Sequence, residues 1–151
     1  VTRVLGKRLG LVTLIVDVAK GFFPVLVSSR LGFDLTVTAL VALAAFLGHL
    51  YPIFLRFKGG KGVATALGVF LGIAPLVAAI VALLFALVVS ISRRVSLASM
   101  AAAGAAPVLF WFLSYPPLLV GLSTTMALLV LFRHHENIRR LISGTEPRFQ
   151  L

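Results

Sequence analysis

Residues 75–92 have the sequence P-L-V-A-A-I-V-A-L-L-F-A-L-V-V-S-I-S, in which no side chain is charged, and Arg93 and Arg94 follow at once. A helix of this length spans about 27 Å at 1.5 Å per residue, close to the roughly 30 Å hydrocarbon core of a bilayer. We therefore expect residues 75–92 to cross a membrane as a single helix.

Further apolar runs lie on both sides of this one. The shorter run 63–73 precedes it, and the closeness of Gly72 to Pro75 predicts a short or half-buried helix, a break, and then a full return span. The other expected spans are residues 9–31, 35–55, 95–113 and 117–132. We predict an all-α fold, a polytopic transmembrane helical bundle of about six segments, with residues 1–151 in a single domain.

The composition supports a membrane protein. Of 151 residues, 60% are hydrophobic and 12% are charged, whereas an ordinary soluble domain has roughly 45–50% apolar and about 25% charged residues. A soluble chain of this size could not bury so much apolar surface. The sequence has no cysteine, which excludes disulfides, thiolate catalysis and cysteine-ligated metals.

The basic residues fall mainly between the expected spans. There are 14 Lys and Arg against 4 Asp and Glu, a net charge of +10. Nucleic-acid binding is the weakest explanation of this positive charge, because the basic residues form no contiguous module. Two explanations remain: the positive-inside bias of membrane proteins, or an anionic substrate. If residues 63–92 enter the membrane and return to the side on which they began, twelve basic residues lie on one side of the membrane, which the positive-inside rule makes cytoplasmic. They are Arg3, Lys7, Arg8, Arg56, Lys58, Lys61, Arg93, Arg94, Arg133, Arg139, Arg140 and Arg148.

Residues 48–65, G-H-L-Y-P-I-F-L-R-F-K-G-G-K-G-V-A-T, place a glycine-rich turn directly before a helix. Close backbone approach, successive N–H groups and the helix N-terminus together favour an anion site, and Lys58 and Lys61 add full charges. The alternative is a basic turn that only fixes the topology. A nucleotide P-loop is disfavoured, because its G-x-x-x-x-G-K-[ST] spacing and its preceding strand are missing.

Polar residues also lie within or near the end of the spans. Asp17 and Lys20 are three residues apart on one helix face, and each charge inside a span costs about 2.5–3.5 kcal/mol on insertion scales. They are either an ion pair that holds helices together or part of a substrate site. His49, beside the Tyr51-Pro52 break, makes either a packing hydrogen bond or a functional contact.

A third polar segment, R-H-H-E-N-I-R-R-L, covers residues 133–141. His134 and Asn137 share a helix face, and Glu136 lies between them. Histidine could act as an acid, a base or a phosphate donor, and asparagine could stabilise an oxyanion; the alternative is a solvated helix end. We expect this amphipathic piece to extend the last helix at the membrane interface and to end at Gly144. Zinc is disfavoured, since no H-E-x-x-H spacing occurs.

The segments G-H-L-Y-P-x-F-x-x-F-K-G-G-K-G-V-A-T (48–65), R-R-V-S-L-A-S (93–99) and R-H-x-E-N-I-x-R-L (133–141), with D-x-x-K-G at 17–21, form one set of motifs. This set closely resembles that of the PlsY family of bacterial membrane acyl-phosphate:glycerol-3-phosphate acyltransferases. The resemblance covers essentially the whole chain. It implies a seven-helix protein of the bacterial inner membrane, with its active site, basic loops and C-terminus on the cytoplasmic side.

The resemblance also implies a reaction and its partners. A fatty acyl group would move from acyl-phosphate to the 1-hydroxyl of glycerol 3-phosphate, giving lysophosphatidic acid and phosphate in the first acylation of phospholipid synthesis. The implied partners are these substrates, membrane lipid and the soluble enzyme that makes acyl-phosphate; no nucleic acid, metal or other cofactor is expected. The alternative function is transport of a small phosphorylated or carboxylated anion, although we find no internal inverted symmetry.

Site roles follow from the same resemblance. The implied catalytic residues are Lys61, Arg3, His134 and Asn137. Further substrate contacts are expected from Lys58, Gly59, Gly60, Gly62, Thr65, His49, Ser96, Ser99, Glu136, Asp17 and Lys20. For at least one of the two serines, helix N-capping is the favoured explanation. Acyl-phosphate is already activated, so direct transfer needs no covalent acyl-enzyme. Either His134 or a substrate phosphate would take the hydroxyl proton.

The beginning of the chain departs from the family pattern. The family starts with another span and a loop of the form G-S-x-N-x-G-A-T-N-V-T-R, of which only Val1, Thr2 and Arg3 are present. We therefore expect this sequence to be a fragment that lacks the first helix and the first motif loop.

Overall fold

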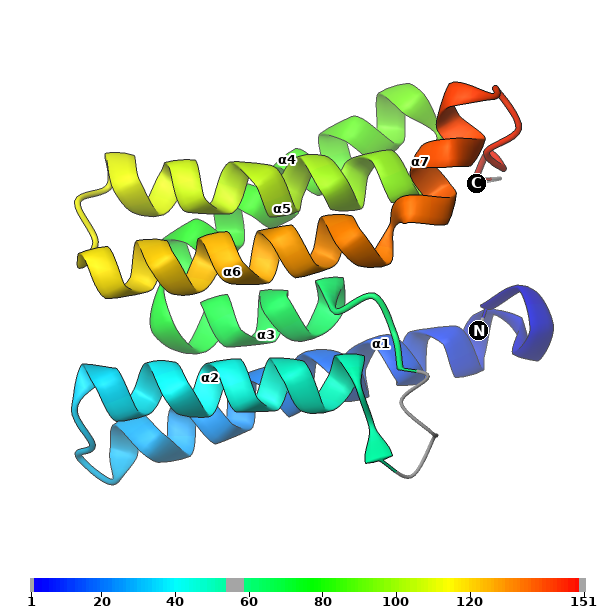
Figure 1. Cartoon of the computed structure of the whole chain (residues 1–151). Helices are drawn as coiled ribbons and strands as arrows, with labels where there is room; N and C mark the ends of the chain where they lie inside the picture. Colours follow the sequence, from blue (N-terminus) through cyan, green and yellow to red (C-terminus); the bar gives the residue numbers. More distant parts are fainter. Residues whose placement is uncertain (1, 54–58, 150–151) are drawn as a thin grey trace. The chain divides into compact units, whose positions relative to one another are not determined.

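The computed structural model describes residues 2–53 and 59–149, with no description of the side chains of residues 2–7. The regular elements in these ranges are helices, as Figure 1 shows, and the predicted all-α fold is confirmed. The elements are α1 (Thr2–Arg30), α2 (Leu35–Leu50), α3 (Val63–Ile73), α4 (Pro75–Ser92), α5 (Val95–Phe112), α6 (Pro117–Arg133) and α7 (His135–Ile142).

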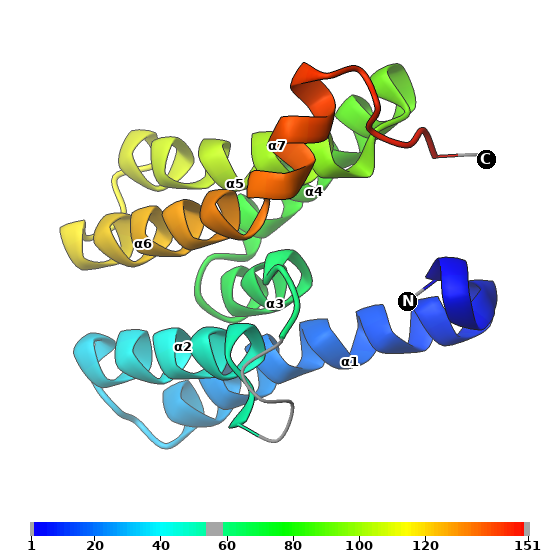
Figure 2. The same ribbon diagram turned by 45° about the vertical axis from the view of Figure 1, so that its right-hand side comes forward.

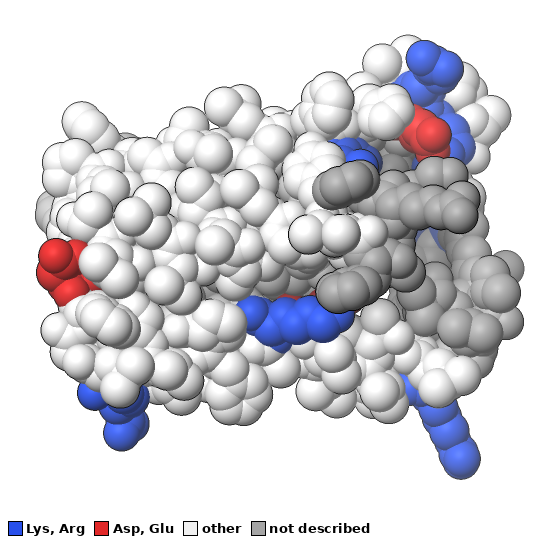
Figure 3. Space-filling view, turned by 60° about the horizontal axis from the view of Figure 1, so that its bottom comes forward, with Lys and Arg blue, Asp and Glu red and all other residues white. Residues whose placement is uncertain are grey.

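Three of the described helices are long and apolar enough to cross a membrane. They are the Arg8–Arg30 part of α1, all of α4 and all of α5. Helices α6 and α7 together provide a fourth span if the pair, bent by 59°, is counted as one. Helices α2 and α3 are apolar but shorter. In the space-filling view few of the visible side chains are charged (Figure 3), as expected of a surface that faces lipid.

The helix boundaries agree with the predicted breaks in most places. Helix α4 covers the predicted residues 75–92, and Ala74 separates it from the short α3. The predicted span 35–55 was too long: α2 ends at Leu50, with Tyr51 as its C-cap. Pro52 explains this end, because proline has no N–H for the helical ladder and disfavours helical geometry in the residue before it.

The last helix does not continue as expected. The chain turns at His134, which is the C-cap of α6 and the N-cap of α7, so residues 135–142 form a separate bent helix. Its predicted end is confirmed: Gly144 has a φ of 72°, and its N–H donates to the carbonyl of Leu141. A left-handed residue just past a helix is the usual glycine termination.

The described chain forms two compact units, residues 1–75 and residues 76–151. In the first unit, α3 packs against α1 and α2, as both ribbon views show (Figures 1 and 2). Three glycines form the contact between α1 and α3. A Cβ on Gly21 would collide with the Thr65 carbonyl, one on Gly68 with the Val18 carbonyl, and one on Gly72 with the Val25 side chain. Small residues of this kind let membrane helices approach closely.

In the second unit, α5 packs against α6, and α7 leaves the end of α6. The buried residues of these two helices include Ala102, Ala106 and Phe110 of α5 and Met126 of α6. After α7 the chain returns to the start of α5, where the Phe149 N–H donates to the Arg93 carbonyl at 2.5 Å. This return brings Glu146 of the C-terminal segment to Ser96 in the first turn of α5.

Candidate active site

The glycine-rich turn, residues 59–62 and here named the glycine loop, rests on the last turn of α2. A Cβ on Gly59 would collide with the carbonyl oxygens of His49 and Leu50, and one on Gly60 would overlap the Nε2 edge of the His49 ring. Gly62 has a left-handed φ of 84° and lies against Phe46 and Leu50. Larger residues would therefore lift the loop away from α2.

The glycine loop leads directly into the N-terminus of α3. Gly62 is the N-cap, and its carbonyl accepts the first helical hydrogen bond from the Ala66 N–H at 2.8 Å. The N–H groups of Val63, Ala64 and Thr65 have no acceptor within the helix. Thr65 is fully buried, and its hydroxyl has no hydrogen-bond partner among the described residues, while Lys61 is exposed. These features are suited to binding an anion.

Three further predicted residues of this unit lie close together: the carboxylate of Asp17 and the side chains of Lys20 and His49. Asp17 Oδ1 lies 3.1 Å from Lys20 Nζ and 3.5 Å from His49 Nδ1. The Asp17 and His49 side chains are 18% and 11% exposed, whereas Lys20 is 56% exposed. We name these three residues the Asp17 cluster. It joins the middle of α1 to the end of α2, directly beneath Gly60 of the glycine loop.

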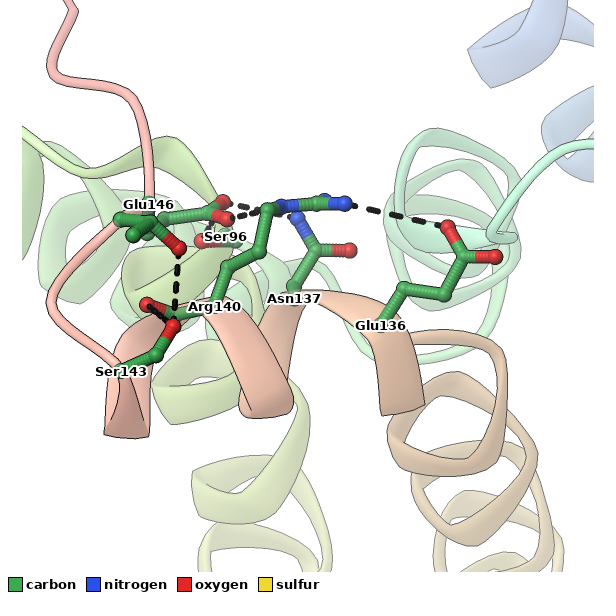
Figure 4. A network of polar contacts seen from close by, with 7 residues as sticks. Ser96, Glu136, Asn137, Arg140, Ser143 and Glu146 are labelled. Atoms are coloured by element: carbon green, nitrogen blue, oxygen red, sulfur yellow. Dashed lines mark hydrogen bonds and ion pairs between the residues drawn. The ribbon is translucent and has the colours of Figure 1, made fainter.

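In the second unit, four polar side chains form what we name the Glu146 cluster (Figure 4). The Glu146 carboxylate accepts hydrogen bonds from the Ser96 hydroxyl at 2.5 Å, the Asn137 amide at 2.7 Å and Arg140 Nε at 2.8 Å. Ser96, Asn137 and Glu146 are buried. Glu136 lies at the edge of this group, 3.8 Å from Arg140 Nη1 and mostly exposed.

The surroundings of Glu146 change its acidity. Burial raises the pKa of this carboxyl group, but the hydrogen bonds from Ser96, Arg140 and Asn137, together with the Arg140 charge, lower it more, to about 2 from 4.5. Glu146 is therefore ionised at neutral pH, and its charge holds the start of α5, α7 and the C-terminal segment together.

His134 is buried at the bend between α6 and α7. Its Nδ1 lies 2.8 Å from the Val130 carbonyl oxygen. Since a carbonyl can only accept, Nδ1 carries the proton, and in the neutral ring Nε2 is the nitrogen with a lone pair. The bend thus gives His134 a fixed ring orientation and a defined tautomer.

The structure places the predicted residues in two groups. In the first unit, Asp17, Lys20, His49, Gly59, Gly60, Lys61, Gly62 and Thr65 lie around the end of α2 and the start of α3. In the second unit, Ser96 and Asn137 bond to Glu146, and Glu136 lies on the other side of Arg140. His134 is the N-cap of α7, and Ser99 is buried in α5. Lys58 and the Arg3 side chain lie outside the described residues.

N-capping does not account for either serine. The N-cap of α5 is Arg94, with no side-chain capping bond, and Ser96 in the first turn bonds to Glu146 instead. Sequence reasoning missed Glu146 and Arg140 as site residues. A signal was present, because Glu146 is one of only four acidic residues in a strongly basic chain and follows the helix-ending Gly144 by two positions.

Comparison with known proteins gives a consistent family. Residues 1–144 match the family described as glycerol-3-phosphate acyltransferase. Curated proteins of that name are 52% identical in Geobacter sulfurreducens and 54% in Geobacter metallireducens, each over 99% of this chain and 77% of the relative. The one from Aquifex aeolicus is 42% identical, over 99% of this chain and 78% of the relative.

Two solved structures are also similar. Both are crystal structures of PlsY (YgiH), an integral membrane glycerol 3-phosphate acyltransferase, in a lysophosphatidic acid form and a glycerol 3-phosphate form. Their TM-scores are 0.93 and 0.94, at 41% identity over 99% of this chain and 76% and 75% of those chains. The resemblance inferred from the motifs, and the integral membrane assignment, are confirmed.

Proposed function

The chain belongs to the glycerol-3-phosphate acyltransferase family, and on this premise we propose that it transfers a fatty acyl group from acyl-phosphate to the 1-hydroxyl of glycerol 3-phosphate. The products would be lysophosphatidic acid and inorganic phosphate. The related structures are described as glycerol 3-phosphate and lysophosphatidic acid forms, which supports this acceptor and this product.

The observation that carries the proposal is the glycine loop at the N-terminus of α3. Both substrates carry phosphate. The loop and the first turn of α3 offer backbone N–H groups, the exposed Lys61 and the buried Thr65 hydroxyl, which has no hydrogen-bond partner within the described part of the chain. Backbone N–H groups can bind the phosphate group of any phosphate ester. Recognition of the rest of the substrate therefore needs other residues. Arg3, Lys58, His134 and Asn137 are the proposed additional residues of the pocket.

The proposed reaction is a direct acyl transfer. The 1-hydroxyl oxygen attacks the carbonyl carbon, a new ester bond forms, and the bond between that carbon and the bridging phosphate oxygen breaks. Phosphate leaves with the bonding electrons and takes the hydroxyl proton, so that no proton remains on the protein. His134 helps to orient the substrate and does not take the proton, while lysine and backbone donors stabilise the negative charge on the carbonyl oxygen.

The proposed location follows from the charge distribution. The helices would lie in the bacterial inner membrane, with the basic loops and the C-terminus in the cytoplasm. There the site could receive acyl-phosphate from the soluble enzyme that makes it, while the apolar helices hold the fatty chain in the bilayer. A reporter fused to either end of α4 would test this orientation.

A two-substrate assay tests the proposed activity. Full-length protein in detergent is incubated with acyl-phosphate, with and without glycerol 3-phosphate, and inorganic phosphate and lipid products are measured. We expect phosphate release only with both substrates, accompanied by lysophosphatidic acid. Uptake of glycerol 3-phosphate by proteoliposomes without any acyl transfer would instead support the transporter alternative.

A further inference from the structure

The Asp17 cluster places a carboxylate in a helix that is otherwise apolar along most of its length. Asp17 lies within Arg8–Arg30, the part of α1 that is apolar enough to cross a membrane. A carboxylate in such a helix is unfavourable unless it is paired, and such residues commonly serve a function. Two side chains are within reach of Asp17: Lys20 on its own helix and the imidazole of His49 on α2.

The geometry argues against direct contact between Asp17 and a substrate phosphate. Asp17 and phosphate are both anions, so their contact would be repulsive. Lys20 faces outward and is 56% exposed, whereas Asp17 and His49 are sheltered. Asp17 therefore acts on its protein neighbours, and His49 is the neighbour that reaches the glycine loop.

The His49 ring has two edges with different partners. Its Nδ1 faces Asp17 Oδ1 at 3.5 Å. Its Nε2 and Cε1 lie where a side chain on Gly60 would have to be placed. An ionised carboxylate can only accept, so it favours the proton on Nδ1 and fixes which edge of the ring faces the loop.

We propose that Asp17 and His49 are positioning residues that hold the glycine loop in its anion-binding conformation. Asp17 orients the imidazole, the imidazole supports the backbone at Gly60, and the loop thereby presents its N–H groups and Lys61 to phosphate. This inference rests on the function proposed above. It assigns the D-x-x-K-G motif two tasks, because Asp17 supports the loop through His49 and Gly21 lets α1 approach α3.

The first test separates positioning from simple stabilisation. Asp17→Ala and His49→Ala are compared with the wild type for KM, kcat and thermal midpoint in full-length protein in detergent. The KM for a phosphate-bearing substrate should rise about tenfold, a size typical of coupling between contacting residues. Asp17→Asn keeps an oxygen that accepts from Nδ1, so it should restore most of the affinity.

The matched control is Asp34→Ala. Asp34 is the N-cap of α2, in the same unit but at the opposite end of that helix, and its carboxylate accepts from the Val37 N–H at 2.8 Å. This variant should lower the thermal midpoint and leave both KM values unchanged. An unchanged KM in Asp17→Ala and His49→Ala, with the same loss of stability as the control, would overturn the proposal.

A second experiment does not depend on the stability of Asp17→Ala. Gly60→Ala introduces a methyl group that overlaps the His49 ring, so the KM of this variant should rise. His49→Ala removes the ring with which that methyl group collides. If the ring supports the loop, the double variant should have the KM of His49→Ala alone. Additive effects would contradict the proposal. Failure of wild-type protein to form lysophosphatidic acid would instead contradict the proposed function, so the two failures are distinguishable.

Discussion

The side-chain amide of Asn137 donates a 2.7 Å hydrogen bond to the carboxylate of Glu146, nine residues further along the chain. The same carboxylate accepts from Ser96 in the first turn of α5. One acidic residue of the C-terminal segment therefore fixes the orientation of an asparagine proposed to contact substrate. Stability and activity in this unit should both depend on that carboxylate.

The first prediction concerns acid stability. The pKa of Glu146 is about 2 in the folded protein against an ordinary 4.5, so its contribution of about 3 kcal/mol is fully present above pH 4.5 and is lost as the pH falls toward 2. Glu146→Gln should lower the free energy of unfolding at neutral pH by a similar amount. It should also flatten the pH dependence across this window, measured by denaturant unfolding in detergent.

The control for this prediction is Glu136→Gln. Glu136 is 72% exposed and pairs with Arg140 at 3.8 Å, and surface pairs of this kind contribute roughly 0–1 kcal/mol. The variant should leave the acid transition almost unchanged. Equal effects of the two glutamate substitutions would contradict the role assigned to Glu146.

The second prediction compares two buried serines on α5. Ser96→Ala removes a 2.5 Å hydrogen bond to an ionised carboxylate, and should destabilise the protein by about 1.5–3 kcal/mol. Ser99→Ala, one turn further along the same helix, does not touch the Glu146 cluster as described and should cost less than about 1 kcal/mol. Thermal unfolding of both variants checks the difference; a larger loss in Ser99→Ala would contradict it.

The hydropathy of the sequence was sufficient to predict which segments form helices, but not where every helix ends. The uninterrupted run 75–92 and the break before Pro75 predict α4 and α3, because length and proline chemistry are local properties. The bend at His134 was not predicted, since the polar and apolar residues of 133–141 fit a continuous amphipathic helix as well as a bent one.

The polar contacts between distant segments were the hardest to predict. The glycine loop could be recognised from its own residues, because glycines and lysines before a helix form a local pattern. The pairing of Asp17 with His49 and of Ser96 with Glu146 depends on how helices pack, and spacing in the sequence does not encode it. Glu146 in particular follows the last helix, where a short polar tail is typical.

The third prediction concerns the glycines between α1 and α3. Gly21→Ala and Gly68→Ala each place a methyl group against a backbone carbonyl of the other helix, and forcing packed helices apart should cost about 3 kcal/mol or more. Gly48→Ala, on α2 with open space around it, should instead stabilise by about 0.5–1 kcal/mol. Thermal unfolding of the three variants gives the test, and a stable Gly68→Ala would show that the helices are not in close contact.

The fourth prediction concerns the proton acceptor. If phosphate takes the proton and His134 only orients the substrate, His134→Ala should lower kcat moderately and keep the shape of the pH–rate profile. A histidine base would instead contribute about 10²–10⁴-fold and produce an acidic limb that the variant loses. The control is His135→Ala, because His135 is exposed and its Nδ1 lies 3.0 Å from the Phe132 carbonyl.

The most direct test of direct acyl transfer follows a heavy-oxygen label placed in the 1-hydroxyl of glycerol 3-phosphate. Attack of that oxygen on the acyl carbon predicts that all of the label appears in the ester of lysophosphatidic acid, with an equal amount of unlabelled phosphate released. Label recovered in a new phosphate ester, with free fatty acid as the other product, would show attack on phosphorus and contradict acyl transfer.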